Sequence, residues 1–173
     1  MEAWVKWSVN PSTGQPWANI INKNGDDGYQ IQHTYSNLYF ETAIKTNVKR
    51  TFIQSTTQAV AGNWYHIVGT WDNTTNLLKL YVNGNLERTA SLTGSITSSA
   101  QNASICKKSW NDRYFNGSID ETAIYNRSLS SDEIKDHYLR GALKLGLKVR
   151  SCASADCSGS DFVGPNGNNS EYS

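Results

Sequence analysis

The middle of the chain carries the clearest alternation of apolar and polar residues, and it predicts three consecutive strands. The run Trp64–Trp71 consists of aromatic and β-branched residues with almost no charge, which is typical of a strand inside a sandwich. After five turn-forming residues, Leu77–Val82 alternates apolar residues with Lys or Tyr, which predicts one buried and one wet face. Asn83-Gly84 is typical of a tight type I′ turn, so we expect Asn85–Ala90 to pair with that strand.

Shorter runs of β-branched and aromatic residues on both sides of this region predict further strands. Clusters of Gly, Pro, Asn and Ser separate the runs, as in other all-β proteins. The sequence therefore predicts an all-β sandwich, with Trp64 and Trp71 inside its core. The further predicted strands are Glu2–Val9, Trp17–Asn22, Tyr29–Tyr35, Leu38–Ile44, Arg50–Ser55, Ala103–Lys107 and Ser118–Tyr125.

One segment has the pattern of an α-helix. Ser130 stands three residues before Glu133, which is the spacing of a capping box, and apolar residues then recur four apart. Gly141 follows the last periodic residue, where a C′ cap would be. We expect a short helix over Ser131–Arg140, with His137 as a solvated side chain off its apolar face.

Gly141 would thus close a first domain over residues 1–141. Beyond it, residues 142–150 alternate apolar and basic side chains with period two, which predicts an extra strand. Residues 151–173 form a polar tail in which Cys152 and Cys157 lie close enough for a small disulfide loop, with a metal site as the alternative. The apolar face of the extra strand would consist of Leu143, Leu145, Leu147 and Val149.

Charge and length exclude some classes of partner. The 173 residues carry a formal net charge of +1 and contain no Lys/Arg cluster that would follow phosphates, so we expect no nucleic-acid partner. No apolar run approaches the roughly 18 residues of a membrane span. Met1 leads directly into the first strand without a signal-peptide pattern, so we expect a mature form or a piece of a longer chain.

One loop has the composition of a sugar-binding site. Sugar binding needs flat aromatic faces for stacking and a few polar groups that fix hydroxyls. A second aromatic pair, Trp17 and Tyr35, is a weaker candidate, and the alternative is that the loop aromatics cap the core. The loop candidates are Trp110, Asn111, Asp112, Arg113 and Tyr114.

Hydrolysis of a glycoside would require two carboxylates that converge on one bond. The nearest pair, Asp120 and Glu121, is adjacent in sequence, so the two side chains should point to opposite faces of a strand. The chain has no G-x-S-x-G nucleophile elbow, and its three His residues fall in unrelated contexts. We therefore expect that this chain is not an enzyme.

Three segments together resemble a known family. These are W-Y-H-I-V-G-T-W-D, then L-K-L-Y-V-N-G, then Y-F-N-G-S-I-D-E-T-A-I-Y-N-R-S-L-S-S-D-E-I. They resemble the laminin-G-like and concanavalin A-like lectin/glucanase family over about Met1–Leu139. The resemblance implies a two-sheet antiparallel jelly-roll sandwich. Its specific closing motif is Gly117-Ser118-Ile119-Asp120-Glu121, followed by Tyr125-Asn126-Arg127-Ser128-Leu129-Ser130.

This resemblance also implies a function. Family members are usually modules of secreted or cell-surface proteins that bind carbohydrate or protein, often with structural calcium. We therefore expect a non-catalytic binding or adhesion module, extracellular or on the cell surface, whose ligand is a glycan or a surface protein. The motif implies that Asp120 is a calcium ligand, and the alternative is a hydrogen bond to the backbone.

The ends of the chain differ from the family pattern. Members usually have one or two strands before the one equivalent to Glu2–Val9, so we expect an open sheet edge that residues 142–150 would fill. That strand could fold back, open a next module, or insert into a second copy of this chain. The alternative function is therefore a structural subunit of an extracellular filament or surface assembly, joined by strand donation.

Overall fold

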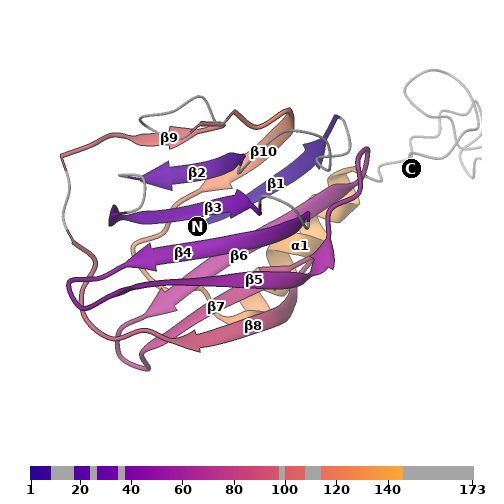
Figure 1. The fold of residues 1–173 in the computed structure, drawn as a ribbon. Helices are drawn as coiled ribbons and strands as arrows, with labels where there is room; N and C mark the ends of the chain where they lie inside the picture. Colours follow the sequence, from indigo (N-terminus) through magenta and orange to yellow (C-terminus); the bar gives the residue numbers. More distant parts are fainter. Residues whose placement is uncertain (9–17, 24–26, 35–37, 98–99, 108–113, 146–173) are drawn as a thin grey trace, which may run out of the picture.

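The computed structural model describes residues 1–8, 18–23, 27–34, 38–97, 100–107 and 114–145 as two antiparallel sheets of five strands and one helix. Figure 1 shows the two sheets face to face. Sheet A contains, in spatial order, β10 (Gly117–Ala123), β1 (Glu2–Trp7), β6 (Trp64–Asp72), β7 (Leu77–Val82) and β8 (Asn85–Ser91). Sheet B contains β5 (Arg50–Gln58), β4 (Tyr39–Lys45), β3 (Tyr29–His33), β2 (Asn19–Lys23) and β9 (Ala103–Ile105).

The predicted jelly-roll sandwich is confirmed, and so is its central hairpin. Every strand expected before the helix is present, with ends that differ by a few residues. Asn83 and Gly84 both adopt positive φ, 50° and 76°, as a type I′ turn requires. β1 is paired on both sides, with β6 and with β10, so the expected open edge does not lie beside this strand.

The core lies between the inner faces of the two sheets. Leu78, Leu80 and Val82 are buried there, as the alternation in β7 predicts. Trp7 is also buried and packs against aromatic rings of sheet B. The prediction that Trp64 belongs to the core is wrong: its ring is half-buried near the sandwich surface, with Lys6 Nζ 5.1 Å from its centre. Trp71 is likewise only half-buried, at the edge of a smaller apolar cluster.

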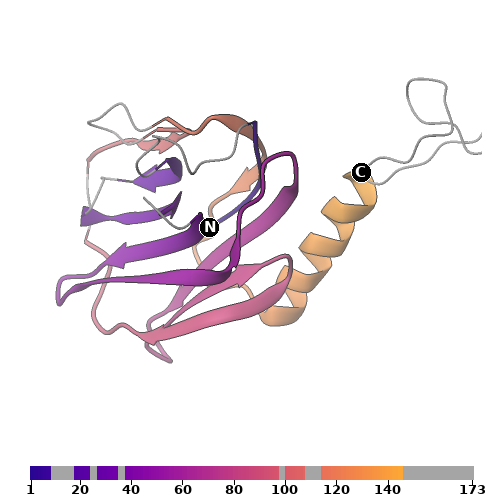
Figure 2. The same cartoon turned by 45° about the vertical axis from the view of Figure 1, so that its right-hand side comes forward.

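The helix α1, Ser131–Leu145, packs on the outer face of sheet A, on the far side of the sandwich from sheet B (Figure 2). Its predicted capping box is confirmed, because Glu133 N–H donates to Ser130 Oγ at 3.2 Å and Ser130 N–H donates to Glu133 Oε2 at 2.8 Å. Ile134 is fully buried in a second apolar cluster with Tyr81. The face of β7 that carries Tyr81 was expected to be wet, and the helix instead covers it.

The helix continues through Gly141, so the predicted C′ cap is wrong. Gly141 packs against the indole of Trp4, and a Cβ at this position would lie less than 3.0 Å from the ring atoms. The close approach of the helix to sheet A, rather than helix termination, therefore explains this glycine.

The strand predicted over residues 142–150 is wrong for residues 142–145, which are the last turn of α1. Leu143, predicted on the apolar face of a donor strand, is instead on the helix and 73% exposed. Tertiary packing of the preceding helical turns overrides the period-two pattern here. Strand donation through this segment therefore loses its geometric basis at residues 142–145. Residues 146–150, with Leu147 and Val149, lie outside the described residues, as do Cys152 and Cys157.

Candidate functional site

The outer face of sheet B carries a row of polar side chains that crosses three strands. Gln32, Glu41 and Gln54 are register neighbours in β3, β4 and β5. Gln32 Nε2 donates to Glu41 Oε1 at 2.6 Å, and Gln54 Nε2 donates to Glu41 Oε2 at 3.1 Å. Each carboxylate oxygen thus holds one amide, which restricts the orientation of both Gln side chains.

A second row lies on the same face, two residues away along each strand. Gln30, Ala43 and Phe52 are register neighbours, and Asn22 Nδ2 donates to Gln30 Oε1 at 3.0 Å. Phe52 is 56% exposed although it is a large apolar residue in the middle of a strand. Its register partner Ala43 has a small side chain, whereas the amides of Gln30 and Asn22 are buried. Phe52 is therefore the member of this row that offers a ligand the exposed aromatic face that sugar binding needs.

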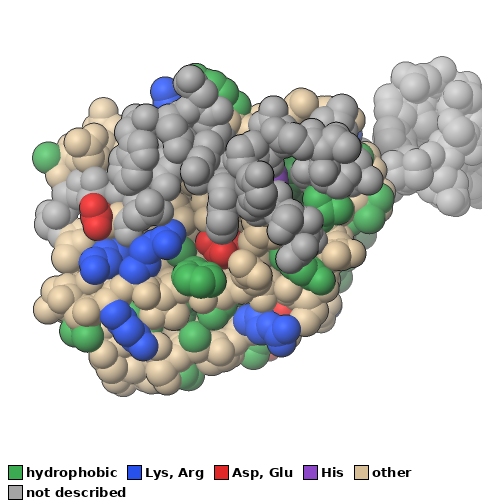
Figure 3. Space-filling view, viewed as in Figure 1, with side chains coloured by type: hydrophobic (Ala, Val, Ile, Leu, Met, Phe, Trp, Pro, Cys, Tyr) green, Lys and Arg blue, Asp and Glu red, His purple; other side chains and the backbone are tan. Residues whose placement is uncertain are grey.

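These rows lead into a groove of about 470 Å³ where sheet B ends at β5. The groove runs along the edge at which β5 faces β8 of the other sheet. Figure 3 shows this side of the molecule, with Lys and Arg side chains spread over the described part of the face and few Asp or Glu. The lining residues are Tyr39, Phe52, Ile53, Gln54, Ser55, Thr56 and Arg88.

A β-bulge in β8 forms the far wall of the groove. Leu80 pairs with Arg88 while its neighbour Tyr81 pairs with Leu86, so Glu87 is an extra residue without a partner in β7. The Glu87 carboxylate accepts hydrogen bonds from the backbone N–H and hydroxyl groups of Thr56 and Thr57 on β5. Partial burial works against ionisation, but these bonds outweigh it and lower the pKa of Glu87 below its usual value. Glu87 therefore ties β8 to β5 beside the groove.

The loop predicted to bind sugar lies almost entirely outside the described residues. Of its five candidates, only Tyr114 is described. This residue is 49% exposed, and the centre of its ring lies 6.0 Å from Lys107 Nζ. Trp110, Asn111, Asp112 and Arg113 are not described, and neither are Trp17 and Tyr35. Ligand contact by this loop stays a prediction.

The predicted calcium ligand Asp120 is exposed on β10. Its Oδ1 accepts a hydrogen bond from the backbone N–H of Glu121 at 2.7 Å, which is the alternative given above. Among the residues that the structure describes, no three His, Cys, Asp or Glu side chains are grouped so that they could hold a metal ion. Calcium binding at Asp120 stays a prediction.

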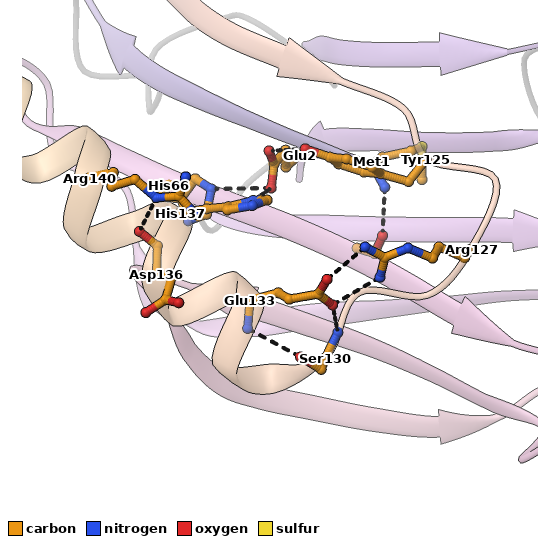
Figure 4. A network of polar contacts seen from close by, with 11 residues as sticks. Met1, Glu2, His66, Tyr125, Arg127, Ser130, Glu133, Asp136, His137 and Arg140 are labelled. Carbon is orange, nitrogen blue, oxygen red and sulfur yellow. Dashed lines mark hydrogen bonds and ion pairs between the residues drawn. The ribbon is translucent and has the colours of Figure 1, made fainter.

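On the opposite side of the molecule, the structure brings together residues that no motif in the sequence connects (Figure 4). Glu2 on β1 accepts hydrogen bonds from Tyr125 Oη at 2.7 Å and from His137 Nδ1 at 3.0 Å. His66 Nε2 on β6 lies 3.7 Å from the same carboxylate. The prediction that His137 is a solvated side chain in an unrelated context is therefore wrong.

The Glu2 carboxylate stays ionised although it is buried. Burial alone would raise its pKa, but the contacts with His66, His137 and Tyr125 outweigh burial and lower the pKa to about 2. Burial and the nearby Glu2 carboxylate raise the pKa of Tyr125 to about 12. Because these partners lie on β6, α1 and the segment after β10, Glu2 fastens the helix to sheet A.

A cavity of about 230 Å³ opens beside Glu2, between sheet A and α1. A register shift in β10 places Glu121 at a bulge with φ of 45°, and Glu121 lines this cavity together with Glu2 and Arg140. Glu2 cannot donate a proton at neutral pH because its pKa is about 2. Glu2 therefore contributes an ionised carboxylate to this cavity, where it holds Tyr125 and His137.

Comparison with solved structures shows the same fold in several binding proteins. A candidate carbohydrate-binding protein from Bacteroides ovatus superposes with a TM-score of 0.63 at 18% identity, covering 78% of this chain and 38% of that one. The binding domain of Paraclostridial Mosquitocidal Protein 1 gives 0.65 at 17% identity, covering 85% of this chain and 38% of that one. A heptameric SAP-like pentraxin from Limulus polyphemus gives 0.58 at 15% identity, covering 78% and 66%. This chain thus spans only about two fifths of the first two proteins.

Comparison of the sequence gives the family. A search of curated proteins finds no sequence that matches. Among the described residues, no helix has both the length and the apolar character needed to cross a membrane. The family model of the concanavalin A-like lectin/glucanases superfamily matches residues 1–135, which is most of the chain. The two-sheet jelly roll and this match show that the chain belongs to the concanavalin A-like lectin/glucanase superfamily, in the laminin G-like branch.

Proposed function

We propose that this chain is a non-catalytic binding module that recognises carbohydrate in the groove along β5. The observation that carries the proposal is the pairing of an exposed aromatic ring with a fixed amide. Phe52 is 56% exposed, and Gln54, two residues farther along the same strand, is held by Glu41. Both side chains line the 470 Å³ groove.

The chemistry of these groups suits a sugar ring. Phe52 offers an apolar face for the C–H groups of a pyranose, in the manner of aromatic sugar-binding sites. Gln54 offers an amide that can donate to one hydroxyl and accept from another. Because the Glu41 carboxylate already fixes this amide, little side-chain freedom is lost when a sugar binds.

The groove favours binding over hydrolysis. Its described lining contains no Asp or Glu, whereas hydrolysis of a glycoside needs two carboxyl groups on either side of the scissile bond. Glu41 lies behind the lining, 2% exposed, with a hydrogen bond to each of its oxygens. It acts as a support for Gln54.

The relatives support this function without identifying the ligand. The Bacteroides ovatus protein is a candidate carbohydrate-binding protein, and the mosquitocidal protein uses this fold in its binding domain. We place the module outside the cell or on its surface, which is where glycans are displayed. A surface protein that offers polar and aromatic groups to the same groove is the alternative ligand.

A glycan array tests the proposal. The wild-type chain is expected to bind at least one glycan class. Phe52→Ala and Gln54→Ala are each expected to weaken that binding about 5- to 30-fold, since stacking and one hydrogen bond are worth about 1–2 kcal/mol each. Ile105→Ala, at a residue 54% exposed on β9 and outside the groove lining, is the matched control and should bind as wild type does.

Two further arms use the same array. Repeating it with a chelator tests calcium, and Trp110→Ala tests the loop that the sequence points to. Binding that survives both Phe52→Ala and Gln54→Ala would contradict the proposed site. The absence of binding to every glycan would contradict the proposed function.

A further inference from the structure

We propose that Arg88 makes the groove selective for glycans that carry a carboxylate, such as uronic acids, over neutral sugars of the same shape. This inference rests on the proposed function and names the ligand class of the same groove. It comes from the position of one guanidinium group and from the arrangement of charge around it.

The bulge in β8 explains why Arg88 reaches the groove. Arg88 pairs with Leu80, whose side chain is fully buried between the sheets, and Glu87 is the extra residue of the bulge. At a bulge, consecutive side chains can leave a strand toward the same side. Glu87 accordingly contacts Thr56 on β5, and Arg88 lines the groove beside Thr56.

No acid of the described chain neutralises Arg88. The adjacent carboxylate, Glu87, accepts hydrogen bonds from Thr56 and Thr57. Among the described residues, it forms no ion pair with Arg88. The described groove lining contains no other charged group. Arg88 is exposed, so its guanidinium stays solvated and available until a ligand arrives.

A guanidinium in this position prefers a carboxylate to a hydroxyl. Its planar fork can form two parallel N–H···O bonds with a carboxylate, and hydrogen bonds to charged groups are stronger than those between neutral groups. Figure 3 shows further Lys and Arg side chains and few Asp or Glu on the described part of this side, which adds to the preference. Glu41, the acid beneath the face, already accepts two hydrogen bonds and is 2% exposed.

Groove size matches this ligand class. Gln54 and Phe52 lie on β5 and Arg88 lies on β8, so one ring can stack on Phe52 while a carboxylate substituent extends toward Arg88. A volume of about 470 Å³ leaves room for such a substituent in addition to the stacked ring. The stacking site and the charge site would thus read different parts of one ligand.

The test uses pairs of probes that differ only in the carboxylate. Oligosaccharides of galacturonic acid and of glucuronic acid are compared with their carboxyl-reduced, neutral counterparts by calorimetry against wild type, Arg88→Gln and Lys79→Gln. Lys79 lies on β7, outside the groove lining, and its replacement removes one positive charge elsewhere. Thermal melts confirm that each variant is folded.

Wild type is expected to bind an acidic probe about tenfold more tightly than its reduced counterpart, as one charge-assisted contact at an exposed site predicts. Arg88→Gln should lose this preference and Lys79→Gln should keep it. The inference is overturned if wild type binds both members of each pair equally, or if Arg88→Gln keeps the preference. If only neutral glycans bind, and Phe52→Ala weakens that binding, the selectivity assigned to Arg88 is wrong while the proposed function stands. If no probe and no arrayed glycan binds, both the selectivity and the proposed function are wrong.

Discussion

Replacing Glu2 by Gln should weaken the fold by removing the charge that fastens α1 to sheet A. The variant keeps the size of the side chain but replaces a carboxylate that Tyr125 and His137 contact at 2.7 Å and 3.0 Å. In the folded chain the pKa of Glu2 falls from its ordinary value of 4.5 to about 2. Since one pKa unit corresponds to about 1.4 kcal/mol, the fold favours the ionised form by about 3 kcal/mol.

Part of this preference is screened, because a cavity opens beside the carboxylate. We therefore expect Glu2→Gln to lower the free energy of unfolding by about 2 kcal/mol at pH 7. For a chain of this length that corresponds to a decrease in Tm of roughly 4–8 °C. Urea unfolding followed by tryptophan fluorescence measures the change, and Asp136→Asn, an exposed carboxylate on the solvent side of α1, is the matched control.

The pH dependence of the free energy of unfolding gives a second, independent test of the role of Glu2. Between about pH 4.5 and pH 2 the unfolded chain protonates Glu2 while the folded chain does not, so wild-type stability should fall over this range. Glu2→Gln should lack that part of the decrease, and the two curves should converge toward pH 2. A loss of less than about 0.5 kcal/mol at pH 7, together with parallel pH curves, would refute the reasoning.

Three further predictions concern single positions. Gly141→Ala should destabilise the fold by about 1–3 kcal/mol although Ala favours helices, because its Cβ would overlap Trp4; urea unfolding and Trp fluorescence measure it, and a stabilised variant would contradict the packing. Glu87→Gln should lower the free energy of unfolding by no more than about 1 kcal/mol, because the site is partly exposed. This effect should disappear in acid, where Glu87 of the wild type is itself protonated, and an equal effect at all pH values would count against the prediction. His33 is fully buried and its pKa is lowered by burial, so stability should fall as the pH decreases below about 6.5; His33→Gln should flatten this part of the curve, and an unchanged curve would show that His33 is not responsible.

Local patterns predicted the strands and turns well. Asn83-Gly84 fixed a hairpin because the turn requires positive φ at both residues, and the structure has it. Ser130 and Glu133 likewise marked the start of α1, because a capping box involves only residues three apart. Features that depend on only a few neighbouring residues can be predicted from a single sequence.

Features that depend on strand register or on long-range packing were not predicted from the sequence. The row of Gln32, Glu41 and Gln54 forms only when three strands align, and nothing in each strand alone specifies that alignment. The bulge at Glu87 shifts register by one residue without a Gly or Pro to signal it. Each polar residue was visible in the sequence, but its neighbours were not.

Helix length and the Glu2 cluster were missed for the same reason. Gly141 has the composition of a cap, and only contact with Trp4 on a distant strand shows that the helix continues. Glu2 and His137 are separated by 135 residues in the sequence. A pattern read along the chain cannot pair them.

The central claim is that the β5 groove on sheet B binds carbohydrate, and a titration followed by two-dimensional NMR tests it most directly. With the tightest glycan from the array, we expect the largest amide shifts at Phe52, Gln54 and Arg88, which line the groove. Shifts confined to the opposite side of the molecule, around Glu2 and α1, would contradict the account.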